Sequence, residues 1–345
     1  MSRFLCVLCM LCAAGSLAAA PTVEFSGYAD VRAGYTLGET DEFALNIGRI
    51  EVTADALILP WMNLEVTIGT YNTMEGKYNA ELGGAFISFF KENDGTTMSL
   101  NIGYFDVPFG LASGWYAFPE NSFMYAPGVT EAYIGEWTDL GVYGSIETEQ
   151  FSLTAFAVRG EMYGIFEELT TPPPLPPGAS ALVDMDKGLA VGLRAAFSPV
   201  EGLTLGVNYA LNAHYDFNDN ISFIAGDVEW ALGPLALAFE YLAYMPKFAF
   251  GDRADTWFAQ AMFGLEDIAD IPVEFGARFD YFAANYSNAV TALLGAGTPP
   301  PAGESSNALT IQANWLADEH LRFGLSFRHQ KDEDDIIMLQ VMGMF

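Results

Sequence analysis

Apolar and polar residues alternate along most of the chain in short stretches. Between residues 23 and 35 the odd positions are mainly apolar, whereas Glu24, Ser26, Asp30 and Arg32 occupy even positions. This two-residue period predicts a β-strand with one apolar and one polar face. The period returns in 50–58, 98–104, 203–211, 273–281 and 321–327. Segments of about ten residues are long enough to cross an outer-membrane hydrocarbon layer at the usual tilt.

The full pattern predicts an all-β fold, a transmembrane antiparallel β-barrel of sixteen strands, with fourteen or eighteen as alternatives. The predicted strands are centred near residues 29, 51, 69, 86, 101, 143, 155, 193, 207, 226, 239, 258, 277, 311, 325 and 340. Short turns alternate with longer loops, which is typical of outer-membrane barrels. The apolar parity changes around Gly226, and this change predicts a β-bulge at that point.

The two ends of the chain carry export and assembly features. Arg3, an apolar run over 4–11 and small residues up to Ala20 predict a cleavable signal peptide over 1–20, followed by one barrel domain over 21–345. The last predicted strand ends on Phe345, in the same parity as its apolar residues. It resembles the C-terminal signal of outer-membrane barrels, so we expect recognition by the barrel assembly machinery.

The composition narrows the class of protein further. The chain has 44 acidic and 14 basic residues, a formal charge of −30, so we expect no binding of nucleic acid. A hydrophobic content of 51% is too high for a disordered acidic protein. No apolar run after residue 20 approaches the roughly 18 residues of a transmembrane helix. A secreted soluble β protein or a membrane barrel remains.

Two features favour the barrel, and therefore the outer membrane of a diderm bacterium with its lipid as surroundings. Trp61, Trp230 and Trp315 lie next to predicted short turns, where an aromatic girdle belongs. The polar faces also carry charged residues at mid-strand, which are tolerable only against a water-filled lumen. All three cysteines lie within the predicted signal peptide, so the mature chain has no disulfide and no cysteine metal site.

The longest interval between predicted strands begins after a motif of glycine, proline and phenylalanine. It reads Gly-x-Phe-x-x-Pro-Phe-Gly and comprises Gly103, Phe105, Pro108, Phe109 and Gly110. With the weaker likeness at 121–124, this motif resembles the phosphate- and polyphosphate-selective porins of Gram-negative outer membranes. The resemblance implies sixteen strands, a homotrimer and a third loop that folds inward to narrow the pore.

The sequence departs from that family in its charges. The phosphate-selective members line their constriction with Arg and Lys, but residues 107–158 contain neither. An anion that sheds water in a narrow neck needs such donors, so phosphate selectivity is not carried over. The loop offers acids instead, which we expect to form an acidic rim that attracts cations: Glu120, Glu131, Glu136 and Asp139. The alternative is that they are ordinary solvated loop acids.

Arginines on the polar faces form a second group of candidate pore residues. They come from strands near the two ends of the chain and would form a basic wall opposite the acidic loop: Arg32, Arg49, Arg278, Arg322 and Arg328. The alternative pairs them with neighbouring acids for packing of the wall alone. Both roles remain open, because buried ion pairs and a pore field can use the same residues.

The sequence thus predicts a porin, a water-filled channel for passive diffusion of ions and small hydrophilic solutes, with modest cation preference. No cofactor or metal is expected. No catalytic site is expected either, since Ser326 and His329 lie three residues apart on a strand and point to opposite faces. Two alternatives are a structural or adhesive barrel with little channel activity, and an anion-selective porin of the phosphate type.

Overall fold

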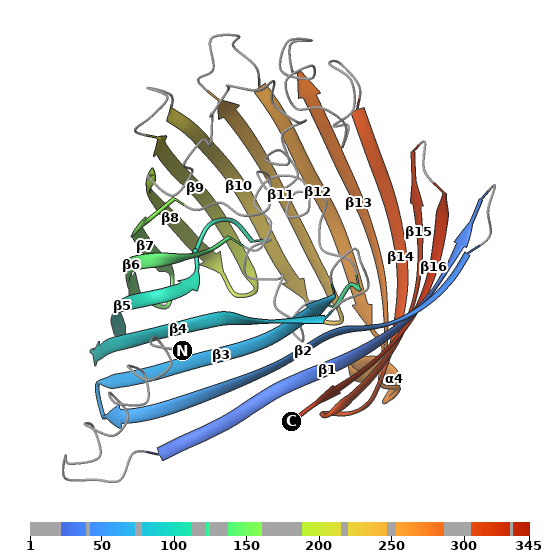
Figure 1. Cartoon of the computed structure of the whole chain (residues 1–345), viewed down its shortest axis with the longest axis horizontal. Helices are drawn as coiled ribbons and strands as arrows, with labels where there is room; N and C mark the ends of the chain where they lie inside the picture. The colour runs from blue at the N-terminus through green and yellow to red at the C-terminus, as the bar shows by residue number, and fades with distance from the viewer. Residues whose placement is uncertain are drawn as a thin grey trace, which may run out of the picture.

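The computed structural model forms one closed antiparallel barrel of sixteen strands (Figure 1). It describes residues 22–38, 42–72, 78–111, 122–124, 137–160, 188–214, 220–246, 253–285, 305–331 and 334–345. Each strand pairs with its neighbours in sequence, and the last strand pairs with the first. The predicted fold, strand number and strand centres are therefore confirmed. The predicted signal peptide lies outside the described residues.

The strands vary from eight to eighteen residues in length. They are β1 (Thr22–Leu37), β2 (Glu42–Leu59), β3 (Met62–Asn72), β4 (Tyr78–Asn93), β5 (Thr96–Asp106), β6 (Thr138–Glu147), β7 (Phe151–Val158), β8 (Gly188–Val200), β9 (Leu203–His214), β10 (Asn220–Leu232), β11 (Leu235–Pro246), β12 (Arg253–Gly264), β13 (Val273–Asn285), β14 (Ser305–Asp318), β15 (Leu321–Gln330) and β16 (Asp335–Met344). One helical turn, α4 (Glu266–Ala269), joins β12 to β13. Within the described ranges, no helix is long and apolar enough to cross a membrane.

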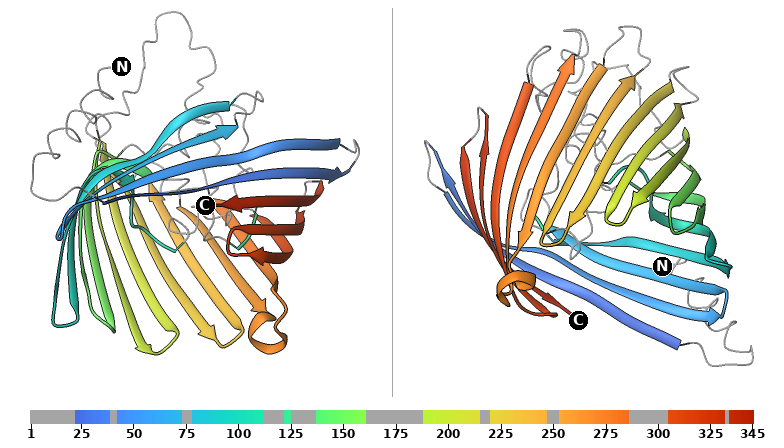
Figure 2. Two further views of the ribbon diagram at one scale, coloured as in Figure 1. Left: turned by 90° about the horizontal axis from the view of Figure 1, so that it is seen from below. Right: turned by 180° about the vertical axis from the view of Figure 1, so that it is seen from behind.

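Short turns gather at one rim of the barrel (Figure 2). The turn between β4 and β5 consists of Asp94 and Gly95, which have φ angles of 48° and 74°. Positive φ at both central residues gives a two-residue turn the twist of its flanking strands, and Asp-Gly is a preferred pair there. Apart from the connection between β12 and β13, which includes α4, the connections at this rim are shorter than those at the other rim, as the sequence predicts.

The barrel is apolar on its outer surface and polar on much of its inner wall. Phe25 is 67% exposed and Leu45 65% exposed, whereas Asn212 and Gln312 are buried on inward-facing positions. A water-soluble protein does not expose so many large apolar side chains in one continuous belt. The belt therefore matches a surface that faces lipid, with the polar residues turned toward the lumen.

Aromatic side chains mark the short-turn end of this belt. Trp61, Trp230 and Trp315 are between 41% and 52% exposed, and all three lie beside short turns. Trp61 stacks on Phe89 with a centroid distance of 6.2 Å, and Trp315 on Phe323 at 5.2 Å. Their position is that of an aromatic girdle at a membrane interface.

The bulge predicted near Gly226 is wrong. β10 pairs with β9 and β11 in unbroken register through Gly226 and Asp227. The parity changes because Phe223 faces the lumen, where it is buried, while Trp230 faces outward. Register shifts occur elsewhere, including one between β1 and β2 at Ala29/Val31.

The seam of the barrel extends by one residue beyond β16. The backbone N–H of Phe345 donates to the carbonyl of Gly27, and the N–H of Gly27 donates to the carbonyl of Phe345, both at 3.0 Å. A Cβ atom on Gly27 would lie 2.7 Å from Cζ of Phe345 and would also meet the carbonyl oxygen of Glu51. The backbone of Glu51 on β2 is the closer of the two, so the approach of β1 to β2 requires glycine at position 27.

We predict that Gly27→Ala lowers the free energy of unfolding by about 1–3 kcal/mol, because the new methyl group meets the backbone of β2 and the ring of Phe345. Urea unfolding of the refolded barrel, followed by tryptophan fluorescence and heat-modifiable gel migration, measures the change. Gly343→Ala is the matched control, since a Cβ there meets nothing within 4 Å on the same seam. Equal stability of the two variants would contradict the prediction.

Candidate pore-lining site

The connection between β5 and β6, the third loop, enters the barrel at residues 107–111. The N–H of Gly110 donates to Oδ1 of Asn208 at 3.0 Å, and the N–H of Leu111 donates to Oε1 of Glu240 at 3.2 Å. Asn208 and Glu240 are buried side chains on the inner faces of β9 and β11. The start of the third loop therefore lies against the inner wall.

An apolar core inside the lumen holds this start of the loop. Phe105, Val107, Phe109, Leu111 and the returning Trp137 are all buried in it. Their partners are inward-facing side chains of β7 to β12: Phe156, Val158, Ala190, Ala210, Phe223, Ala225, Ala238, Leu242 and Phe258. Removal of this apolar surface from water stabilises the inward fold of the loop. The family-like Phe105 and Phe109 thus serve packing inside the barrel.

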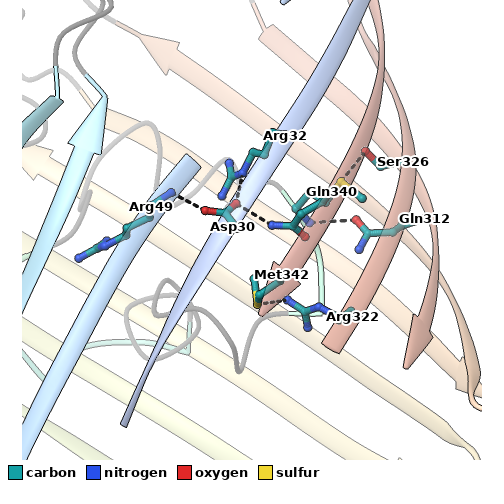
Figure 3. Close-up of polar contacts among 9 residues, drawn as sticks. Asp30, Arg32, Arg49, Gln312, Arg322, Ser326, Gln340 and Met342 are labelled. Atoms are coloured by element: carbon teal, nitrogen blue, oxygen red, sulfur yellow. Dashed lines mark hydrogen bonds and ion pairs between the residues drawn. The ribbon is translucent and has the colours of Figure 1, made fainter. Parts of the chain in front are cut away.

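A second part of the third loop contacts another sector of the wall. The carbonyl of Ser122 accepts hydrogen bonds from the amides of Gln312 and Asn314, the latter at 2.9 Å. The N–H of Met124 donates to Oε1 of Gln312, also at 2.9 Å. Figure 3 draws Gln312 among the polar side chains of this sector. The stretch 122–124 is therefore fixed to the inner face of β14.

Of the four acids of the predicted rim, Asp139 alone lies within the described residues. Asp139 has 0% exposure, and its two oxygens accept hydrogen bonds from the N–H groups of Leu140 and Gly160, each at 2.7 Å. Its carboxylate anchors the start of the next long connection and does not stand open to the lumen. Glu120, Glu131 and Glu136 lie outside the described residues.

The five arginines of the predicted basic wall lie on inner faces around the seam, on β1, β2, β13 and β15: Arg32, Arg49, Arg278, Arg322 and Arg328. They differ in exposure. Arg278 and Arg322 are buried at 1% and 5%, whereas the side chains of Arg32 and Arg49 keep 24% and 15%. The guanidinium of Arg278 lies 5.0 Å from the ring centroid of Phe123, which covers it. The third loop therefore separates part of this wall from water.

Three of these arginines form ion pairs with acids two residues away on the same strand. Nε of Arg32 lies 2.5 Å from Asp30, a terminal nitrogen of Arg49 lies 3.0 Å from Glu51, and Nε of Arg278 lies 3.0 Å from Asp280. The contacts of the other two include neutral atoms. Arg322 donates to Sδ of Met342 at 3.4 Å, and Arg328 donates to Oε1 of Gln330 at 2.9 Å.

Asp30 links three strands at the seam, a role that the sequence analysis missed. Its fully buried carboxylate accepts hydrogen bonds from Nε of Arg32, from the backbone N–H of Arg49 on β2, and from Nε2 of Gln340 on β16 at 2.9 Å (Figure 3). The register shift between β1 and β2 lies at this position, so the carboxylate binds a backbone donor of the irregular ladder. A nearby Gly48 leaves room for it.

A second missed network supports the loop anchor. Arg194 on β8 donates two hydrogen bonds to Asp227 on β10, at 2.7 and 2.9 Å. Asp227 also accepts from Nδ2 of Asn208, at 2.9 Å. Because Asn208 accepts the bond from Gly110, the network fixes the side chain that holds the third loop. The alternation of polar and apolar residues predicts that these side chains face inward, but it does not reveal which residues they contact.

The serine and the histidine of β15 lie on different faces of the strand. Ser326 is buried inward, whereas His329 lies outward with its side chain 58% exposed and bonded to Asp335, so the two do not meet. No group of three or more metal-ligating His, Cys, Asp or Glu side chains occurs within the described ranges.

The fold of this chain matches the folds of solved structures. No family model matches the sequence, and no curated protein matches it. A trimer form of OmpT from Vibrio cholerae superposes with a TM-score of 0.64 at 11% identity, over 95% of this chain and 100% of the other. The chain has the fold of a porin-like outer-membrane channel.

Two further porin-fold structures give the same result. The outer membrane channel DcaP of Acinetobacter baumannii has a TM-score of 0.64 at 10% identity, covering 94% of this chain and 97% of DcaP. OmpF of Salmonella typhi has a TM-score of 0.65 at 11% identity, with 94% and 98% covered. Such identities show the fold alone, and the finer resemblance to phosphate-selective porins is not confirmed.

We predict that Asp30→Ala destabilises the barrel by about 2–5 kcal/mol, because it leaves the donors of Arg49 and Gln340 and the partly exposed guanidinium of Arg32 without their acceptor. The midpoint and slope of urea unfolding give the change. Glu24→Ala serves as the control, since Glu24 is an exposed acid on the same strand. An unfolding midpoint equal to that of the control would show that the hydrogen bonds of Asp30 do not stabilise the barrel.

Proposed function

We propose that this protein is an outer-membrane porin that forms a water-filled channel for passive diffusion of ions and small hydrophilic solutes. The observation that carries the proposal is the distribution of side chains: an apolar belt outside, charged and amide side chains inside, and a loop packed within the lumen. Barrels of about sixteen strands are wide enough to leave an aqueous passage rather than a packed interior.

Charge supports a modest preference for cations. The chain carries a formal charge of −30, and residues 107–158 contain no Lys or Arg to bind an anion beside the third loop. In this proposal Glu120, Glu131 and Glu136 line the constriction. Asp139 has a structural role, because its carboxylate is buried and bonded to backbone.

The basic wall divides into two parts in this proposal. Arg32, Arg49 and Arg328 keep partial exposure and contact the permeating solution. Arg278 and Arg322 are buried and support the third loop and the seam. The transverse field expected of five arginines is therefore weaker than their number implies, since the paired acids offset much of it.

Export and assembly follow from the same proposal. Residues 1–20 act as the signal peptide, and Phe345, 62% exposed at the seam, is available to the barrel assembly machinery. We propose a homotrimer in outer-membrane lipid, in keeping with the trimer form described for the OmpT structure. No cofactor is required for passive diffusion.

We predict discrete conductance steps when the purified barrel is added to a planar lipid bilayer. In a KCl gradient, the sign of the reversal potential should show that potassium permeates more readily than chloride. The acidic lumen concentrates cations and so biases the current. A reversal potential of the opposite sign would overturn the cation preference and favour an anion-selective porin. Absence of steps would favour a structural barrel.

We also predict that the double variant Glu131→Gln and Glu136→Gln moves the reversal potential toward zero, because it removes two negative charges from the constriction. The pair Glu266→Gln and Glu319→Gln removes the same charge from the exposed short-turn rim and is the control. If both double variants keep the wild-type potential, the two loop acids do not line the path.

A further inference from the structure

The inner wall of the barrel is unevenly covered. Inward-facing side chains of β7 to β14 include many that are buried, among them Ala210, Leu242, Phe258 and Thr310, each with 0% exposure. Ala210, Leu242 and Phe258 belong to the apolar core on which the start of the third loop packs. A solute crossing the lumen cannot touch side chains that the loop covers.

The inward-facing side chains at the short-turn half of β2 and β3 are more open. Thr53 and Asp55 on β2, and Asn63 and Glu65 on β3, are all partly exposed. They share the inner face with Arg49 and Glu51, which are also partly exposed. We name the inward-facing residues of 49–55 and 63–65 the open strip.

Two carboxylates face each other directly across the open strip. Asp55 and Glu65 are cross-strand partners in the β2–β3 register. Like charges in directly opposite positions repel each other and destabilise a sheet. Asp55 accepts one hydrogen bond from Asn63 at 2.9 Å, and the partly buried Glu65 faces the like charges of Asp55, Asp106 and Glu51. Within the described ranges, neither Asp55 nor Glu65 has an ion-pair partner.

The nearby arginines do not cancel this charge. Arg49 is paired with Glu51, and Arg32 on the neighbouring strand is paired with Asp30. Each arginine is therefore already balanced by an acid of its own strand. The surplus of the open strip is negative, and it consists of Asp55 and Glu65.

We propose that Asp55 and Glu65 make the open strip a charge-selecting surface of the channel, which favours solutes with a positive charge, such as alkali cations and small organic ammonium ions. A passing cation relieves the repulsion between the two carboxylates, whereas an anion increases it. The proposal rests on the proposed channel function. It assigns charge selectivity to acids of the barrel wall as well as to the acids of the third loop. The sequence pattern alone points to arginines on that wall.

The first test neutralises the pair without changing its shape, by Asp55→Asn together with Glu65→Gln. The potassium-to-chloride permeability ratio should fall by about twofold or more in roughly 0.1 M salt, where the Debye length is about 10 Å. The rim variant Glu266→Gln with Glu319→Gln should keep the wild-type ratio. Conducting channels with an unchanged ratio would overturn the role of the strip while leaving the channel function intact.

A second measurement does not depend on removing the pair. The chain has no cysteine after Cys12, so Thr53→Cys introduces one thiol beside Asp55 on the open strip. A cationic methanethiosulfonate reagent should modify it at least about threefold faster than an anionic one, because the local potential is negative. Ser326→Cys is the buried control and should react with neither.

The two measurements separate the possible failures. Equal rates for both reagents at position 53, or no reaction there, would overturn the proposed strip even if the channel conducts. A wild-type barrel that never conducts would overturn the channel function itself, and the proposal about the strip would fall with it.

Discussion

Closure of the sheet between β1 and β16 is the constraint on which the rest of the structure depends. A lipid environment offers no hydrogen bonds, so each backbone N–H and C=O in the belt must pair within the sheet, and an open edge is not tolerated. Ten registered residue pairs join β1 to β16, and Phe345 adds a further pair with Gly27. Asp30 fastens the same seam from inside, through donors on β1, β2 and β16. The outer apolar belt and the enclosed lumen both follow from this closure.

One side of the lumen is filled by packed apolar side chains, and the opposite side is lined by partly exposed charged side chains. The third loop brings phenylalanine, valine, leucine and tryptophan side chains into the interior, and the inner wall of β7 to β12 supplies small and aromatic partners. The opposite sector, on β2 and β3, keeps charged side chains with partial exposure. The chain therefore places a hydrophobic core, normally the centre of a soluble protein, along one side of a membrane barrel.

The strands could be predicted from the sequence because the two-residue period reports directly which face each side chain takes. The period does not report what covers that face. Phe223 disturbs the pattern in the way a bulge would, although it is an inward residue of the loop core in an unbroken ladder. Asp139, Arg278 and Arg322 have inward parity as expected, but contacts distant in sequence bury them. The link from Asp30 to Gln340 spans 310 residues and leaves no local signal.

The seating of the third loop constrains the order in which the barrel can be completed. Gly110 is 98 residues from its partner Asn208, Leu111 is 129 residues from Glu240, and Met124 is 188 residues from Gln312. Contacts of such long range form late, since the chain between them must be placed first. Until β9 to β14 are inserted, the apolar residues of the loop have no wall to pack on and remain exposed to water. The described parts of the loop can therefore reach their places on the inner wall only once those strands are in position.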